Sequence, residues 1–72
     1  MSQIIDARGL SCPQPVLMTL HAIRKLKEEE LIVLVDTDAS RENVIRSVSS
    51  AGWDIIAVQN ENDAYRITIA RR

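Results

Sequence analysis

Cys12 is the residue of this chain best suited to covalent chemistry, and it is the only cysteine. Two prolines, Pro13 and Pro15, follow it closely. Proline is favoured in the first turn of a helix because its missing N–H would have had no intrahelical partner, and it pushes the preceding residue toward an extended conformation. We therefore predict that Cys12 lies just outside a helix that begins at Pro13 or at Pro15.

A cysteine at a helix entrance can act as a nucleophile. The partial positive charge and unpaired N–H groups of a helix N-terminus favour an anion, and the thiolate is the reactive form of cysteine. Helix N-termini or nearby cations lower a cysteine pKa from about 8.5 to roughly 3.5–7.5. We expect the pKa of Cys12 to be lowered in this way. Arg8 would add to the effect if its side chain folded back over the turn.

The opposite interpretation is a buried, unreactive cysteine, because free cysteine often behaves as a small hydrophobic residue. The flanking residues favour the reactive interpretation, since they are not typical of a core strand or a core helix. These residues are Ser11, Pro13, Gln14 and Pro15. We therefore predict that the thiol is accessible.

Several other chemistries lack the residues they need. One cysteine cannot support a self-contained dithiol cycle, and a metal site would need more Cys or His ligands than the chain contains. His21, the only histidine, would lie about two helical turns beyond Cys12, so we interpret it as an exposed surface residue. Gly9 and Gly52 are the only glycines, and no glycine-rich phosphate loop is present. We expect no cofactor and no metal. The chemistry that remains possible is a transient covalent bond from the thiolate to a small cargo or to a partner protein.

The composition fits a small folded domain. With 72 residues, of which 46% are apolar and 26% charged, we expect residues 1–72 to form a single domain. The net charge of -1 and the low aromatic content disfavour nucleic acid as a direct partner. No apolar run is long enough to span a membrane. A lone cysteine fits a reducing compartment, which predicts a cytoplasmic location.

Six segments with helical or strand periodicity follow one another along the chain. The predicted segments are a strand from Ser2 to Asp6, a helix from Val16 to about Leu26, a strand from Leu31 to Val35, a helix after Ser40, and strands from Trp53 to Val58 and from Tyr65 to Ala70. A crossover helix between parallel strands packs on one face of the sheet. The predicted fold is thus an α/β, two-layer (α+β) sandwich, with both helices on one face of a four-stranded mixed sheet.

Finer features of these segments can also be predicted. In the first helix the apolar stripe comprises Val16, Leu20, Ile23 and Leu26, with Leu17 beside it, and residues 27–30 close the helix. In the second helix the stripe comprises Val44, Ile45, Val48 and Ala51. The segment Asp36-Thr37-Asp38-Ala39-Ser40 supplies turn and N-cap chemistry, and Asn43 follows Ser40 by three residues, as in a loose relative of the capping box. Gly52 is expected to end the helix in a left-handed conformation. Residues 59–64 form a hairpin loop, and Trp53 is a core or edge anchor.

Around Cys12 the chain resembles the TusA family of sulfur-transfer proteins, also called SirA-like, and in particular its YedF-like branch. The segment that carries the resemblance is Asp6-Ala7-Arg8-Gly9-Leu10-Ser11-Cys12-Pro13-Gln14-Pro15. It contains the family's Cys-Pro-x-Pro motif after a first strand. The resemblance implies a fold like that of the C-terminal domain of translation initiation factor 3, with sheet order 1-2-4-3 and the last strand antiparallel.

The resemblance also implies a function. Cys12 would accept sulfur as a persulfide from a donor such as a cysteine desulfurase, and would relay it to an acceptor protein, for example toward tRNA thiolation or cofactor synthesis. Such a protein is a sulfurtransferase-like carrier. The residues that match motif positions and would shape the loop are Asp6, Gly9, Pro13 and Pro15, whereas Arg8 and Gln14 occupy variable positions. The chain departs from the family pattern at residues 27–30 and 36–39, which leaves the donor and acceptor open.

Three alternatives remain open from the sequence. The exposed loop from Leu10 to Met18 could dock a regulatory partner without sulfur chemistry. The same anion-stabilising site could carry selenium in place of sulfur. RNA binding would rest on Arg66, Arg71 and Arg72, which acidic residues elsewhere in the chain balance.

Overall fold

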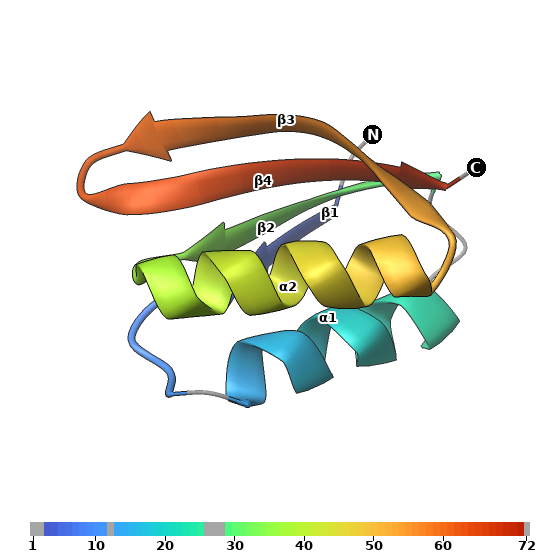
Figure 1. Ribbon diagram of the computed structural model, residues 1–72, viewed down its shortest axis with the longest axis horizontal. Coiled ribbons are helices and arrows are strands. Elements are labelled where there is room, and N and C mark those ends of the chain that lie inside the picture. The colour runs from blue at the N-terminus through green and yellow to red at the C-terminus, as the bar shows by residue number, and fades with distance from the viewer. Residues whose placement is uncertain (1–2, 12, 26–28, 72) are drawn as a thin grey trace.

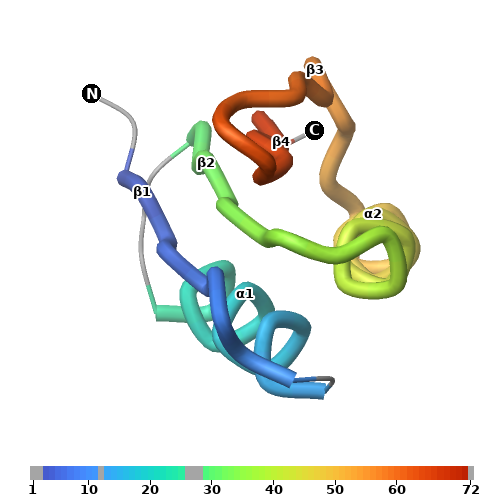
Figure 2. Tube along the Cα trace, turned by 90° about the vertical axis from the view of Figure 1, so that its left-hand side faces the viewer, coloured from blue at the N-terminus to red at the C-terminus, as the bar shows by residue number. Residues whose placement is uncertain are grey.

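The computed structural model describes residues 3–11, 13–25 and 29–71, and its elements follow in the predicted order. Their bounds are β1 Gln3–Asp6, α1 Gln14–Lys25, β2 Glu30–Val35, α2 Asp38–Ser50, β3 Trp53–Glu61 and β4 Ala64–Arg71. Both helices cover the same face of the sheet (Figures 1 and 2). The predicted two-layer fold is therefore confirmed. In the described part of the chain no helix is long and apolar enough to cross a bilayer.

The four strands are ordered β1-β2-β4-β3. β1 runs parallel to β2 with Ile5 opposite Val33, and β4 runs antiparallel to both β2 and β3. This arrangement confirms the sheet order that the family resemblance implied. β2 lies between β1 and β4 in the sheet, so its continuous aliphatic run is largely buried. Leu31, Val33 and Val35 are fully buried.

The core lies between the sheet and the two helices. β2 and β4 contribute aliphatic side chains, α2 contributes Val44 and Val48, and Trp53 is only 2% exposed at the start of β3. Trp53 is therefore a core residue, as predicted. In β4, Ile67 and Ile69 are buried and alternate with more exposed neighbours, which is the pattern of a strand with one covered face.

The buried stripe of α1 differs from the prediction. Pro15, Thr19 and Ala22 are buried at its centre, whereas Leu17 is 53% exposed on the opposite side of the helix. The element nearest to α1 is α2, and small side chains allow helices to approach closely. The Thr19 hydroxyl is satisfied because it donates to the Pro15 carbonyl at 2.8 Å. Val16 and Ile23 only flank this stripe, where they pack against the core. Leu26 lies outside the described residues.

The start of α2 also corrects the prediction. Thr37, and not Ser40, is the N-cap: its backbone is extended and its side-chain oxygen accepts the Ser40 N–H at 3.1 Å. Ser40 is buried inside the first turn. At the other end Ala51 is the C-cap and is exposed, so it does not belong to the buried stripe. Gly52 has φ +91°, which confirms the left-handed residue expected there.

The hairpin loop is shorter than predicted. β3 continues to Glu61 and β4 begins at Ala64, so only Asn62 and Asp63 connect them. Both have positive φ, of 50° and 63°, as a two-residue type I′ turn requires. The polar residues before the turn lie in an exposed edge strand, which needs backbone pairing but no apolar side chains.

Candidate functional site

The candidate site is the loop that leads from β1 into α1. Cys12 itself lies outside the described residues, so its accessibility and its ionisation stay predictions. The residues before and after it are described, and they define how the loop is held. The other predicted site residues fall into two groups, one at the end of β1 and one at the start of α1.

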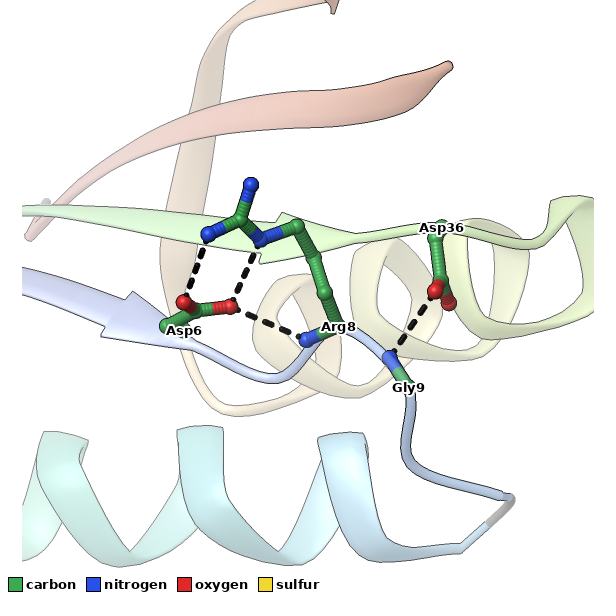
Figure 3. A network of polar contacts seen from close by, with 4 residues as sticks. All are labelled: Asp6, Arg8, Gly9 and Asp36. Carbon is green, nitrogen blue, oxygen red and sulfur yellow. Dashed lines mark hydrogen bonds and ion pairs between the residues drawn. The ribbon is translucent and has the colours of Figure 1, made fainter. Parts of the chain in front are cut away.

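The first group is anchored to the sheet. Beyond β1, the Ala7 N–H donates to the Leu34 carbonyl at 2.9 Å, which extends the pairing with β2 by one residue. The chain then turns at Gly9, which has φ +76°, a conformation that glycine adopts without strain. The Gly9 N–H donates to the Asp36 carboxylate at 2.8 Å (Figure 3). The loop is thereby tied to the residue that follows β2.

Asp36 is a site residue that the sequence reasoning missed. β1 and β2 are parallel, so their carboxyl ends meet at one edge of the sheet and bring Asp36 beside Gly9, 27 residues away in sequence. A signal was present in the sequence, since Asp36 directly follows the most strongly predicted strand. Sequence reasoning took Asp36 only as part of a turn.

Asp6 and Arg8 form an ion pair across the turn. The Arg8 Nη2 and Nε atoms donate to the two Asp6 carboxylate oxygens at 2.8 and 2.9 Å, and the Arg8 N–H donates to the same carboxylate at 3.1 Å. The Arg8 side chain, followed by its backbone N–H, lowers the pKa of Asp6 from 3.8 to about 2. The Asp6 carboxylate in turn raises the pKa of Arg8. Both side chains are about half exposed.

This pairing corrects one expectation about Arg8. Its guanidinium lies on the sheet side of the loop, turned away from α1 (Figure 3). Arg8 therefore does not fold back over the turn, and its charge is directed at Asp6 instead. In this structure the Arg8 guanidinium is paired with the Asp6 carboxylate.

The second group lies at the start of α1, which begins at Gln14, between the two expected positions. The Leu17 N–H donates to the Pro13 carbonyl at 3.0 Å, and the Gln14 N–H donates to the Ser11 carbonyl at 2.9 Å. Of positions 13–15, the two prolines have no N–H and that of Gln14 is bonded to the Ser11 carbonyl, so these three positions offer no free N–H to an anion. The helix would act on a nearby thiolate mainly through its dipole.

Two surface depressions flank the loop. One, of about 450 Å³, is lined by Gly9, Leu10 and Ser11 of the loop and by residues around the start of α2. The other, of about 480 Å³, is a mainly apolar groove between the edge strand β1 and α1. Its lining residues are Ile4, Ile5, Asp6, Gln14, Leu17, Met18, His21 and Ala22. His21 is exposed, as predicted. A partner that reached the loop would contact the two depressions.

Within residues 3–11, 13–25 and 29–71, no three His, Cys, Asp or Glu side chains gather as a metal site would require. The polar network beside the loop is built from hydrogen bonds and one ion pair.

Comparison with known proteins links this site to a family. Residues 3–71 match the family model described as Sulfurtransferase TusA. Sulfur carrier protein TusA of Pseudomonas aeruginosa is 31% identical over 70 residues, which cover 96% of this chain and 89% of that protein. The protein of the same name from Pseudomonas paraeruginosa matches to the same extent.

A solved structure matches the fold as well. The crystal structure of a SirA-like protein from Desulfitobacterium hafniense has a TM-score of 0.81 to this chain at 33% sequence identity, and the match covers 93% of each chain. The sequence similarity and the similarity in fold thus extend over nearly the same length as the family match.

Proposed function

The chain belongs to the TusA sulfurtransferase family, and on that premise we propose that it is a sulfur carrier whose Cys12 holds a persulfide sulfur and passes it to an acceptor protein. Residues 1–72 would act as one carrier domain. The names of the relatives support the carrier role. The motif Cys12-Pro13-Gln14-Pro15 supports the choice of residue.

One observation carries the proposal most directly. The described residues on the two sides of Cys12 are held in place, on the sheet side by the bonds from Ala7 and Gly9 and on the helix side by the bond from Gln14 to Ser11. A carrier must present its sulfur to two different partners in turn, and a loop with fixed ends favours that task because little ordering is needed at each encounter.

The proposed transfer has two balanced steps. The Cys12 thiolate attacks the outer sulfur of a donor persulfide, an S–S bond forms to Cys12, and the donor cysteine leaves as a thiolate. An acceptor thiolate then attacks the outer sulfur on Cys12, and the Cys12 thiolate leaves. No external oxidant or reductant is required. A cysteine desulfurase is the proposed class of donor.

The test of this function is sulfur loading. The protein is incubated with a cysteine desulfurase and cysteine, and its intact mass is measured before and after treatment with a thiol reductant. We expect the wild type to gain the mass of one sulfur, which the reductant removes, and we expect Cys12→Ser to gain none. Equal gain by Cys12→Ser, or no gain by the wild type with any of several desulfurases, would contradict the proposal.

Two finer predictions belong to the same proposal. We propose that the chain is of the YedF-like branch. The choice between sulfur and selenium is tested by repeating the loading experiment with selenocysteine as the substrate and a selenocysteine lyase as the donor enzyme. A regulatory docking module without sulfur chemistry is the alternative, and the exposed apolar groove beside α1 is compatible with it. In that case Cys12→Ser would keep full function in cells.

A further inference from the structure

We propose that Asp36 is a positioning residue for Cys12, because its carboxylate holds the loop in place through the Gly9 N–H. This inference rests on the proposed function, in which Cys12 is the residue that receives sulfur. Asp36 would act on Cys12 indirectly. It would act by fixing the course of the chain three residues before Cys12.

The bond from Gly9 to Asp36 has the properties of an anchor. At 2.8 Å it is a charge-assisted hydrogen bond, a class that is shorter and stronger than a bond between neutral groups. Gly9 adopts φ +76° at this turn. A side chain at position 9 would meet no atom within 4 Å, so backbone conformation is the reason for glycine here, not space.

Its place in the loop makes this bond distinctive. Upstream, Ala7 is still paired with Leu34, and downstream the Ser11 carbonyl accepts from Gln14. Among described residues 8–11, the bond from Gly9 is the one hydrogen bond to a residue distant in sequence. Loss of the Asp36 acceptor would therefore free the middle of the loop while its ends stayed attached.

Asp36 is itself well placed to act as a fixed point. Val35 before it is fully buried in β2, and Thr37 after it caps α2 through the Ser40 N–H. Asp38 accepts a hydrogen bond from the Tyr65 hydroxyl of β4. The backbone on both sides of Asp36 is thus held by the core and by α2, so the position of its carboxylate is set by the fold.

Two substitutions separate positioning from charge. Asp36→Asn keeps an oxygen that can accept the Gly9 N–H but removes the negative charge, whereas Asp36→Ala removes both. A carboxylate that acted through its charge would disfavour a nearby thiolate, so both variants would then make Cys12 ionise more readily. A positioning role predicts that Asp36→Ala impairs Cys12 much more than Asp36→Asn does.

The experiment uses the full chain and three readouts, which are the rate of sulfur loading from a desulfurase, the pH midpoint of Cys12 alkylation by iodoacetamide, and hydrogen exchange of the Gly9 amide. For Asp36→Ala we expect loading to slow roughly tenfold, the midpoint to move toward about 8.5 and Gly9 exchange to accelerate. Asp36→Asn, which keeps a neutral and weaker acceptor for the Gly9 N–H, should lie closer to wild type than to Asp36→Ala in all three readouts. Glu29→Ala, which removes an exposed carboxylate before the other end of β2, is the control.

The outcomes are distinct. Equal behaviour of Asp36→Ala and Asp36→Asn, or an unchanged alkylation profile in Asp36→Ala, would overturn the positioning role. A wild type that takes up no sulfur would contradict the proposed function instead. Alkylation and Gly9 exchange need no partner, so they would still decide for or against Asp36 in that case.

Discussion

Asp6 and Arg8 are charged, half exposed, and two residues apart, yet three donor groups of Arg8 reach the one carboxylate. Exposed ion pairs contribute little to stability because solvent screens them. The value of this pair is geometric, since it sets the direction of the chain as it leaves β1. Its electrostatic signature is the low pKa of Asp6.

The Asp6 titration gives the first prediction. In Arg8→Gln we expect the Asp6 pKa to rise from about 2 toward 3.8, because the guanidinium bonds are lost. The folded-state pKa is depressed, so the pair stabilises the fold above pH 3.8 and loses this effect as the pH falls toward 2. A carbon-detected NMR titration of the Asp6 carboxyl measures the midpoint. The same midpoint in both proteins would show that Arg8 is not the cause.

At the scale of elements, the two helices begin by different devices. At the start of α1, prolines remove N–H groups that would have needed partners. At the start of α2, the N-cap Thr37 supplies an acceptor for one of the unpaired N–H groups of that helix. The second device also fixes the segment that carries Asp36. The start of α2 therefore supports the fold and the candidate site together.

We predict that Thr37→Ala lowers the free energy of unfolding by about 1 kcal/mol, because the Ser40 N–H loses its capping acceptor. Thr37→Ser keeps a hydroxyl and should be close to wild type. Urea denaturation monitored by circular dichroism measures both. If the alanine and serine variants were equally stable, the capping role would have to be abandoned.

At the scale of the whole molecule, stability rests on the layer between sheet and helices. The interior strands β2 and β4 supply most of the fully buried aliphatic side chains, α2 adds Val44 and Val48, and the helices close over one face only (Figure 2). Two leucines show the contrast: Leu31 of β2 is 0% exposed, whereas Leu17 of α1 is 53% exposed beside the groove.

These leucines form a matched pair for a stability test. Leu31→Ala should lower the free energy of unfolding by about 2–5 kcal/mol, because it removes buried contacts and leaves a cavity. Leu17→Ala should change it by no more than about 0.5 kcal/mol. Equilibrium denaturation of both variants provides the comparison. A loss of similar size in Leu17→Ala would place that side chain in the core, contrary to the structure.

The sequence by itself determined the order of the elements, the central strand, the glycine that ends α2 and the loop that contains Cys12. These features depend on residues close together in the chain, through periodicity and turn chemistry, so they can be predicted without knowledge of contacts. The phase of α1 could not, because Leu17 and its neighbours satisfy the same spacing and only packing selects the buried side.

Only the tertiary structure decided how the loop is held. The contact between Gly9 and Asp36 exists because two parallel strands end at the same edge, and this pairing depends on the register between segments 27 residues apart. The partner of Arg8 depended likewise on the course of the turn. Local patterns predict a reactive residue between a strand and a helix, but the contacts that hold the connection between them come from elements that meet only when the chain is folded.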